Sequence, residues 1–266
     1  MKAAALAAAF AAIASCAGAE EPLEEDADQD EVWEVTLGPA VGWGPDYEGS
    51  DDYDLDLRPH VEITYRDLIF LEGPSLGANL ISITDPGSGG RLLAGPVVRY
   101  GGGRDENDNP ALSGLGDVDD SVEIGGFAGY RVGPWSISAT ILQDVGGGHE
   151  GLRGEFGVGY GVELTADLGA RLEVSTSWAD GDYMSSYFGV TGPQSAASGL
   201  PQHDADGGFK DVGLSLGASW EMFDGWFLSG QIGYARLLGD AADSPIVEDE
   251  GSADQVFAAS SVTYRF

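Results

Sequence analysis

The stretch Asp52–Tyr65, DYDLDLRPHVEITY, alternates between two kinds of side chain over an unusually long run. Its two faces are Tyr53, Leu55 and Leu57 against Asp54, Asp56 and Arg58. Successive side chains of a strand point to opposite faces, so this pattern predicts a strand with one apolar and one polar face. Strands of soluble proteins usually have about five or six residues. A tilted strand that crosses a bilayer needs about 9–11.

The same alternation recurs to the C-terminus, and Trp and Tyr residues lie near many segment ends. The segments are Val32–Trp43, Leu68–Ser82, Arg91–Tyr100, Ser121–Val132, Trp135–Asp144, Leu152–Leu164, Leu168–Trp178, Lys210–Met222, Trp226–Leu237 and Gln255–Phe266. Aromatic residues at both ends of long strands are typical of the girdles of outer-membrane barrels. The sequence therefore predicts an all-β fold, a single closed antiparallel transmembrane β-barrel.

The number of strands follows from the connections between these segments. Short turns at Gly133–Pro134, Ala166–Asp167 and Phe223–Gly225 alternate with long loops, which predicts periplasmic turns and external loops. The segments then number about eleven, whereas bacterial single-chain barrels have an even number of strands. We therefore predict 10 or 12 strands, with the miscounted segment between Val32 and Arg91.

The N-terminal region is predicted to direct export. Residues 1–19 have a positive start, an apolar stretch and the small residues Ala17–Ala19, which is typical of a secretory signal peptide. In an alternative interpretation, the stretch Ile13–Cys16 resembles a bacterial lipobox and Cys16 is lipidated. Residues 20–31 form an acidic run that predicts a disordered leader, and residues 32–266 form the barrel.

Composition and the three histidines exclude several functions. The chain has 45 acidic and 12 basic residues, a formal charge of -33, which argues against binding to nucleic acid. A hydrolase at the barrel rim would need a serine and a carboxylate beside His60, His149 or His203. No G-x-S-x-G motif is present. We therefore predict that the protein is not an enzyme and that no residue is catalytic.

No metal or cofactor site is predicted. The loop that begins at Asp105 resembles a calcium loop, with Asp105, Asn107 and Asn109 at alternate positions. It then departs from the motif, because Pro110 replaces the turn glycine and Gly116 occupies the position of the bidentate glutamate. The glycine-rich runs elsewhere are not followed by a helix, which excludes a dinucleotide site.

The final strand, SSVTYRF, is predicted to serve as an assembly signal. Val262, Tyr264 and Phe266 share one face of this strand, and the chain ends on an aromatic residue. A last strand of this kind resembles the signal that the outer-membrane assembly machinery recognises. We expect the three side chains to face lipid.

The loop Pro45–Tyr53 is the second candidate. It is too irregular for a wall strand, and its acidic and aromatic residues allow two interpretations. In the first, the loop is a folded connection that sets the register of the first two strands. In the second, Asp46, Tyr47 and Glu48 form a surface on which a partner docks.

Several long motifs resemble one known family. They are PDYEGSDDY (Pro45–Tyr53), GGHEG (Gly147–Gly151), SYFGVT (Ser186–Thr191), SGLPQHDADGGFKDVG (Ser198–Gly213), GDAADSPIV (Gly239–Val247) and the terminal YRF. On these motifs the chain resembles the MipA/OmpV family, the MltA-interacting-protein-like outer-membrane proteins of Gram-negative bacteria. The resemblance covers nearly the whole chain after the acidic leader.

The resemblance implies a barrel in the outer membrane, in contact with outer-membrane lipids. For the namesake of the family it implies a scaffold that links a lytic transglycosylase to a bifunctional penicillin-binding protein in murein synthesis. A scaffold of this kind is the leading expectation for the present chain. Two alternatives stay open: a narrow diffusion channel that favours cations, because of the acidic excess, and a lipid hydrolase at the rim.

Overall fold

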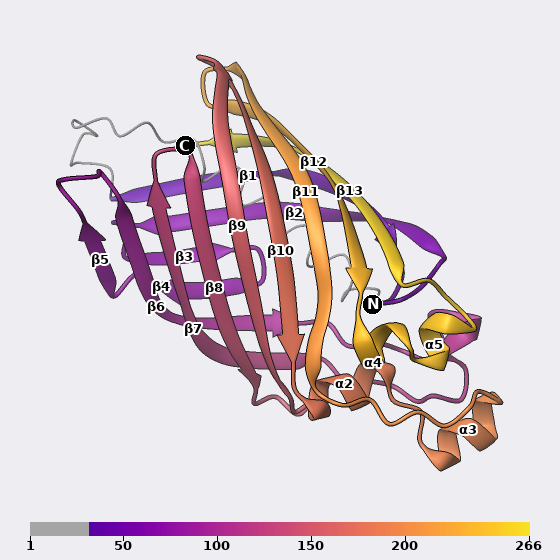
Figure 1. The fold of residues 1–266 in the computed structure, drawn as a ribbon. Helices are drawn as coiled ribbons and strands as arrows, with labels where there is room; N and C mark the ends of the chain where they lie inside the picture. Colours follow the sequence, from indigo (N-terminus) through magenta and orange to yellow (C-terminus); the bar gives the residue numbers. More distant parts are fainter. Residues whose placement is uncertain (1–31) are drawn as a thin grey trace.

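The computed structural model describes residues 32–266, so the predicted signal peptide, the leader and Cys16 lie outside the described residues. Thirteen strands form one sheet (Figure 1). They are β1 (Trp33–Pro45), β2 (Tyr53–Tyr65), β3 (Ile69–Glu72), β4 (Ser75–Ala78), β5 (Ile81–Thr84), β6 (Arg91–Gly101), β7 (Ser121–Val132), β8 (Trp135–Asp144), β9 (Leu152–Thr165), β10 (Leu168–Ala179), β11 (Gly208–Phe223), β12 (Trp226–Leu237) and β13 (Asp254–Arg265).

The sheet closes on itself as an antiparallel barrel. β1 pairs with β2 and with the last strand, β13, and consecutive strands pair around the rest of the ring. β4 and β5 both pair with β6, one after the other, so the two short strands act as one interrupted wall strand. Counted in this way the barrel has twelve strands, which confirms the predicted closed barrel and one of its two predicted strand numbers.

The miscounted strand lies in the region that the sequence indicated. Leu68–Ser82 was expected to form one segment, but it contains β3, β4 and the start of β5. The chain reverses between β3 and β4 at Gly73, whose φ of 53° is the left-handed conformation that glycine adopts readily. Pro74 follows and cannot donate a backbone hydrogen bond.

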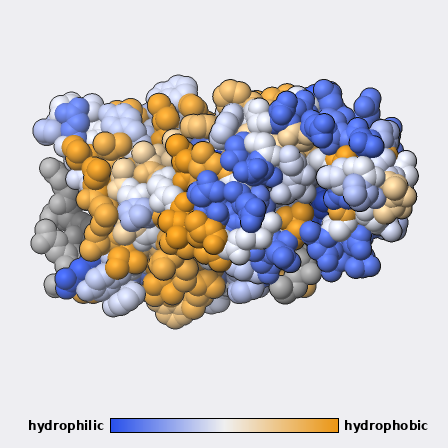
Figure 2. Space-filling model, turned by 90° about the horizontal axis from the view of Figure 1, so that it is seen from below, coloured by the Kyte–Doolittle hydropathy of each residue, from blue (hydrophilic) through white to orange (hydrophobic). Residues whose placement is uncertain are grey.

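The wall separates an apolar outer face from a polar lumen. Figure 2 shows apolar side chains gathered over the strands and hydrophilic side chains at the end of the molecule that carries the helices. Aromatic side chains pair at the levels where the strands end. The ring centroids of the pairs are 4.6 Å apart for Trp33–Tyr65, 4.8 Å for Trp135–Tyr160 and 5.1 Å for Trp226–Tyr264 at the periplasmic end, and 4.6 Å for Trp43–Tyr53 at the external end.

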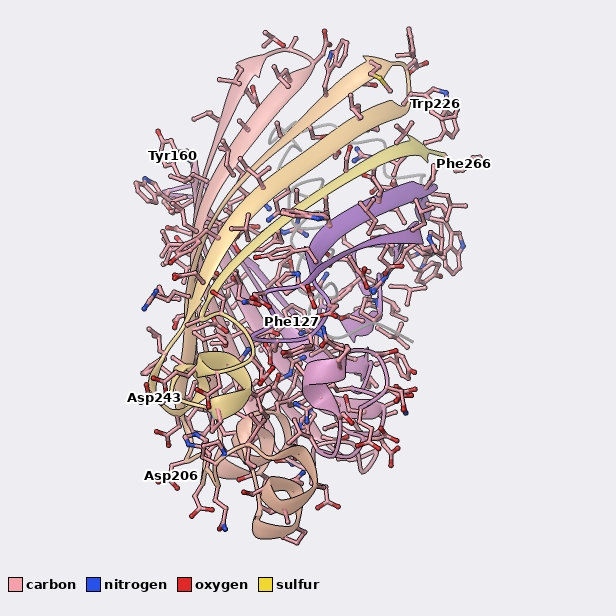
Figure 3. The ribbon with its side chains drawn as sticks, turned by 90° about the vertical axis from the view of Figure 1, so that its right-hand side faces the viewer. Phe127, Tyr160, Asp206, Trp226, Asp243 and Phe266 are labelled. Carbon is pink, nitrogen blue, oxygen red and sulfur yellow. The ribbon has the colours of Figure 1, made fainter. Side chains whose placement is uncertain are left out.

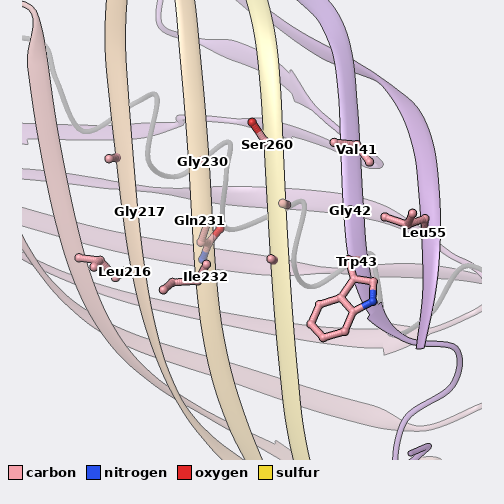
Figure 4. Close-up of a pocket in the computed structure, with 13 residues that line it drawn as sticks. Val41, Gly42, Trp43, Leu55, Leu216, Gly217, Gly230, Gln231, Ile232 and Ser260 are labelled. Carbon is pink, nitrogen blue, oxygen red and sulfur yellow. The ribbon is translucent and has the colours of Figure 1, made fainter. Parts of the chain in front are cut away.

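A shallow hollow of about 480 Å³ runs over the outer wall, across β11, β12, β13 and β1. Figure 4 shows Leu216 and Ile232 on one side of it and Trp43 on the other. Its floor is low because small residues such as Gly230 and Ala258 occupy the wall between them. The lining of this hollow is almost entirely apolar.

The long external loops carry all the helices of the described residues. These are η1 (Pro110–Leu112), α2 (Gly181–Phe188), α3 (Gly192–Ser198), α4 (Gly239–Ala242) and α5 (Pro245–Glu248). They gather at one end of the barrel, while the other end has only short turns (Figure 1). None of the helices in residues 32–266 is long and apolar enough to cross a membrane.

Candidate functional site: a helix-centred cap over a charged lumen

Helix α2 lies at the centre of the external loops. Asp180 precedes it and accepts a hydrogen bond from the Tyr183 N–H at 3.1 Å, which satisfies one of the free amides of the first turn. Its buried face has the spacing of a helix and consists of Tyr183, Met184, Tyr187 and Phe188. Gly151 packs so closely under this helix that an added Cβ would lie 2.4 Å from the Tyr183 nitrogen.

α2 contacts each of the other four long loops, so the five loops form one body, which we call the loop cap. Each of the four loops contributes a side chain that contacts a side chain or a main-chain carbonyl of α2. The contacts are Tyr183 Oη to Glu48 Oε2 at 3.0 Å, Arg104 Nη1 to Tyr187 O at 2.7 Å, Ser244 Oγ to Phe188 O at 2.6 Å, and the His149 ring at 4.8 Å from the Tyr183 ring. The cap therefore lies as one packed body at the external end of the barrel (Figure 1).

Tyr47 anchors the first loop in this cap. Its side chain is 4% exposed and packs in a cluster with Leu112, Leu115, Val190 and Ile246, which come from three other loops. Burial raises the pKa of the Tyr47 phenol to about 12, because the charged form would lose its hydration. The phenol is therefore neutral, and its ring packs as part of the buried cluster.

Asp46 and Glu48 are also engaged inside the cap. The Asn109 side-chain amide donates to Asp46 Oδ2 at 2.8 Å, and Lys210 Nζ forms an ion pair with Glu48. Tyr47 is buried, and both carboxylates have partners within the chain. A docking role for Asp46, Tyr47 and Glu48 stays a prediction. The arrangement agrees with the other interpretation of this loop, a folded connection.

Replacing Glu48 by glutamine is expected to lower the opening free energy of α2 by about 1.5–3 kcal/mol, the usual contribution of a hydrogen bond to a charged group. Lys210 would keep Asp211, whose Oδ2 lies 3.0 Å from its Nζ, but would lose one of its two carboxylates. Hydrogen exchange of the α2 amides measures this change. Glu150→Gln, an exposed acid in a neighbouring loop, is the control. Equal protection in both variants would contradict the assignment.

The histidines are held by structural contacts. His149 Nε2 lies 3.2 Å from Glu123 Oε1, and its Nδ1 accepts from the Gly151 N–H at 3.1 Å. His203 Nε2 lies 2.9 Å from the Asp240 carbonyl oxygen. His60 lies in the lumen, with its Nε2 3.0 Å from Glu62 Oε1. Each described histidine thus meets a carboxylate or a main-chain group, and none of these contacts brings a serine hydroxyl to an imidazole nitrogen.

The loop that resembles a calcium loop uses its side chains for turns. Asp105 Oδ1 accepts from the Asn107 N–H at 2.8 Å, and Asn109 Oδ1 accepts from the Ala111 N–H at 2.8 Å to begin η1. The Asn109 amide is directed to Asp46 instead of toward Asp105. Within residues 32–266 no group of three or more His, Cys, Asp or Glu side chains is placed to hold a metal ion.

A chain of charges lies along one part of the inner wall, near the cap. Arg153 Nε and Nη2 donate to the two oxygens of Glu123 at 2.5 and 2.7 Å, and Arg153 Nη1 donates to Glu155 at 2.6 Å. Arg99 Nη1 then donates to Glu155 at 2.8 Å. Because Arg99 lies on β6, Glu123 on β7 and the others on β9, the network joins three strands on the same side of the barrel.

This network is not among the predicted features, although the sequence carries a signal for it. Glu123, Arg153 and Glu155 occupy alternate positions of long strands whose other face is apolar. Charges on one face of a wall strand must point into the lumen, where they need partners of opposite sign. Which partners they find depends on the relative register of three strands, and alternation alone does not determine that register.

The last strand presents the predicted residues to lipid. Tyr264 packs edge-on against Phe266, with ring centroids 4.7 Å apart. Thr263, between Val262 and Tyr264, is buried on the lumen side. Val262 lies on the same outer face as Tyr264. The Phe266 N–H donates to the Val35 carbonyl at 2.9 Å, so the final residue closes the ladder between β13 and β1. The role of these residues as an assembly signal stays a prediction.

Deleting Phe266 is expected to reduce the amount of assembled barrel, because the closing strand loses an aromatic residue at the periplasmic girdle and a backbone hydrogen bond. The heat-modifiable form in isolated outer membranes measures assembly. Phe266→Tyr keeps the ring and the amide and serves as the control. Normal assembly of the deleted chain would refute the role of the terminal residue.

An apolar belt with aromatic girdles, a polar lumen and a closed ring of twelve strands define an integral outer-membrane β-barrel. The chain belongs to the family described as MltA-interacting protein MipA, whose model matches residues 37–266. It is 28% identical over 180 residues to the outer membrane protein Omp26La of Vibrio anguillarum. It is 26% identical over 178 residues to the outer membrane protein OmpV of Vibrio cholerae. Each match covers 66% of this chain and 65% of the relative.

Solved outer-membrane barrels are more distant. The outer membrane channel DcaP of Acinetobacter baumannii is 9% identical, with a TM-score of 0.43 over 88% of this chain and 96% of its own. An outer membrane channel from Pseudomonas putida F1 is 11% identical, with a TM-score of 0.43 over 93% of this chain and 100% of its own.

Proposed function

We propose that this barrel is an interaction protein that holds a periplasmic partner at the outer membrane. The family description names MltA as an interacting protein, which supports a lytic transglycosylase as the partner. A penicillin-binding protein is the second partner that the sequence resemblance implies. The observation that carries the proposal is the shape of the periplasmic rim.

The periplasmic rim is uneven and projects on one side. The last register pair between β8 and β9 joins Trp135 to Tyr160, but β9 continues to Thr165. Figure 3 shows the strands β9 to β12 rising beyond the level of the labelled Tyr160. Two large apolar side chains near the tips are widely exposed, Leu164 at 59% and Phe223 at 72%.

The projecting part of β9 also has an open edge. Beyond Tyr160, β9 makes one further backbone hydrogen bond on the side of β8: the Gly161 N–H donates to the Pro134 carbonyl at 2.8 Å. An unpaired edge outside the membrane is a template to which a strand of another protein adds. Leu164 supplies apolar contact there, and Glu163 and Asp167 favour a partner with basic residues.

Site-specific photo-crosslinking in intact cell envelopes tests this proposal. A crosslinker at Leu164 or Phe223 is expected to capture a periplasmic murein enzyme, identified by mass spectrometry. The same crosslinker at Ile232, in the middle of the lipid-facing wall, and at Asp204, in the loop cap, are the controls. Murein enzymes captured equally from all four positions, or from none of them, would overturn the docking surface.

A cation channel is the second candidate, because the external loops are strongly acidic. Residues 46–52, 102–120, 145–151, 180–207 and 238–253 contain 20 Asp and Glu residues and one Arg. The loop cap and the charges on the inner wall oppose free passage of ions. We therefore expect no steady conductance in planar bilayers at neutral pH. A stable cation-selective current would assign the protein to the channels instead.

A further inference from the structure

One side of β2 has no neighbouring strand over most of its length. β1 pairs with the whole of β2, from Tyr53 to Tyr65. On the other side, β3 pairs only with Glu62–Tyr65. Among residues 32–266 no strand pairs with the outer edge of Tyr53–His60. The barrel ring is therefore complete in its periplasmic half and open beside β2 in its external half.

Three other segments border this opening, which we call the β2 window. Below it is the turn between β3 and β4, where the Gly73 N–H donates to the Val61 carbonyl at 3.1 Å and the Tyr100 N–H donates to the Pro74 carbonyl at 3.0 Å. Above it the Asn109 amide joins Asp46 and Asp52, at 2.8 and 3.1 Å. The β6–β7 loop, which carries Asn109, borders the far side.

The exposure of the outer side chains of β2 agrees with a missing neighbour. Leu55 and Leu57 are 73% and 79% exposed, whereas Leu216, in the fully paired β11, is 49% exposed. The stacked pair of Trp43 and Tyr53 lies at the external end of the wall, at the level of the lipid headgroups. The β2 window therefore lies at the depth of the outer leaflet.

An unpaired strand edge is strongly unfavourable in hydrocarbon, because the free N–H and C=O groups lose their hydration without gaining a partner. Pro59 removes one of these donors. The remaining groups need water or a polar ligand. The side chains just behind the edge are suited to a wet opening, since Asp56 and Arg58 are ion-paired, point to the lumen and are partly exposed.

A second copy of the chain does not fill the window by strand pairing. Two barrels in one membrane share the same orientation, so a twofold axis along the membrane normal places their β2 strands in the same vertical direction. The strands tilt in opposite senses about that axis and therefore cross, instead of lying side by side. The occupant must come from the lipid phase or from water.

We infer that the β2 window is a water-filled lateral portal between the lumen and the outer leaflet, which admits the ammonium-bearing head of a lipid. The acyl chains remain in the membrane, beside Leu55 and Leu57. The lining carries more acids than bases: Asp54, Asp56, Glu62 and Glu72 lie with Arg58, Arg99 and His60. Asp56 is ion-paired with Arg58, Glu62 lies 3.0 Å from His60, and Arg99 is paired with Glu155. This lipid site lies on a different face from the periplasmic rim and does not depend on the proposed partner.

Hydrogen exchange of the full chain in lipid vesicles tests the opening itself. Peptides from Tyr53–His60 are expected to exchange about half of their amides rapidly, because alternate amides point away from β1. Peptides from the middle of β12, which is paired on both sides, are the internal reference. Slow exchange of all amides in Tyr53–His60 would overturn the portal, because the edge would then be covered.

Electron paramagnetic resonance with chain-labelled lipids tests the ligand. Vesicles that contain the protein are expected to immobilise labelled phosphatidylethanolamine several-fold more than labelled phosphatidylglycerol. The double variant Asp54→Asn, Asp56→Asn should lose this preference. The variant Asp204→Asn, Asp206→Asn removes the same charge from the loop cap and should keep it.

The results separate the ligand from general electrostatic attraction. Loss of the preference in both variants would show that net charge alone selects the lipid and would refute the site. The same preference in wild type and in the window variant would refute it as well. Heat modifiability of each variant verifies that the barrels are assembled, and the hydrogen exchange of the wild-type chain is informative even if a variant fails to fold.

Discussion

Glu123→Ala is expected to lower the free energy of unfolding by about 3–5 kcal/mol, the usual loss when one member of a buried ion pair is removed. The Glu123 side chain is 1% exposed and receives hydrogen bonds from Arg153 at 2.5 and 2.7 Å. Without it, Arg153 keeps only Glu155, and His149 loses the carboxylate at its Nε2. Urea unfolding from lipid vesicles measures the change.

The matched control for Glu123 is Glu163→Ala, an exposed acid on the projecting part of β9. A surface substitution of this kind usually changes stability by no more than about 0.5 kcal/mol. Similar losses for the two variants would mean that the charges on the inner wall are hydrated and stabilise the barrel little.

Ile232→Arg is expected to cost about 2–4 kcal/mol, the penalty for an arginine on the lipid face at the midplane of a barrel. Ile232 lies halfway along β12 and is 61% exposed on the outer face. The arginine would have to leave the hydrocarbon or thin the bilayer around it. The free energy of folding into vesicles measures the cost.

Val262→Arg is the depth control for this prediction. Val262 lies two residues from Tyr264, whose ring packs at 5.1 Å from that of Trp226 in the periplasmic girdle. Near an interface the penalty falls to about 0–1 kcal/mol. If both variants lost the same stability, the assigned position of the membrane on the wall would be wrong.

The walls of the barrel could be predicted because their period is local. In Asp52–Tyr65 every second side chain is apolar. In a membrane barrel these side chains face lipid and the alternate polar side chains face the lumen, so the pattern alone predicts a wall strand. The girdle and the alternation of short and long connections followed from the same pattern. The miscount near Gly73 arose because β3 and β4 have only four residues each, too short to show a period.

The loop cap could not be predicted in this way. Tyr47 is buried by residues from three other loops, at separations of 65 to 199 residues along the chain, and no local pattern encodes such contacts. The starts of the helices, in contrast, depend on residues that are close together in the sequence. Thr191 and Gln194 form a capping box at the start of α3, and Asp180 caps α2, so both helix starts carry a local sequence signal.

The loop cap also determines where the cell-surface part of this chain is free to vary. A change in any residue that contacts α2 alters the packing of several loops at once, so these positions can change only in concert. α3 contributes no buried residue, and it projects at the outer tip of the molecule (Figure 1). Recognition by antibodies or phages would fall on this tip, where substitutions cost the barrel least and escape variants arise most readily.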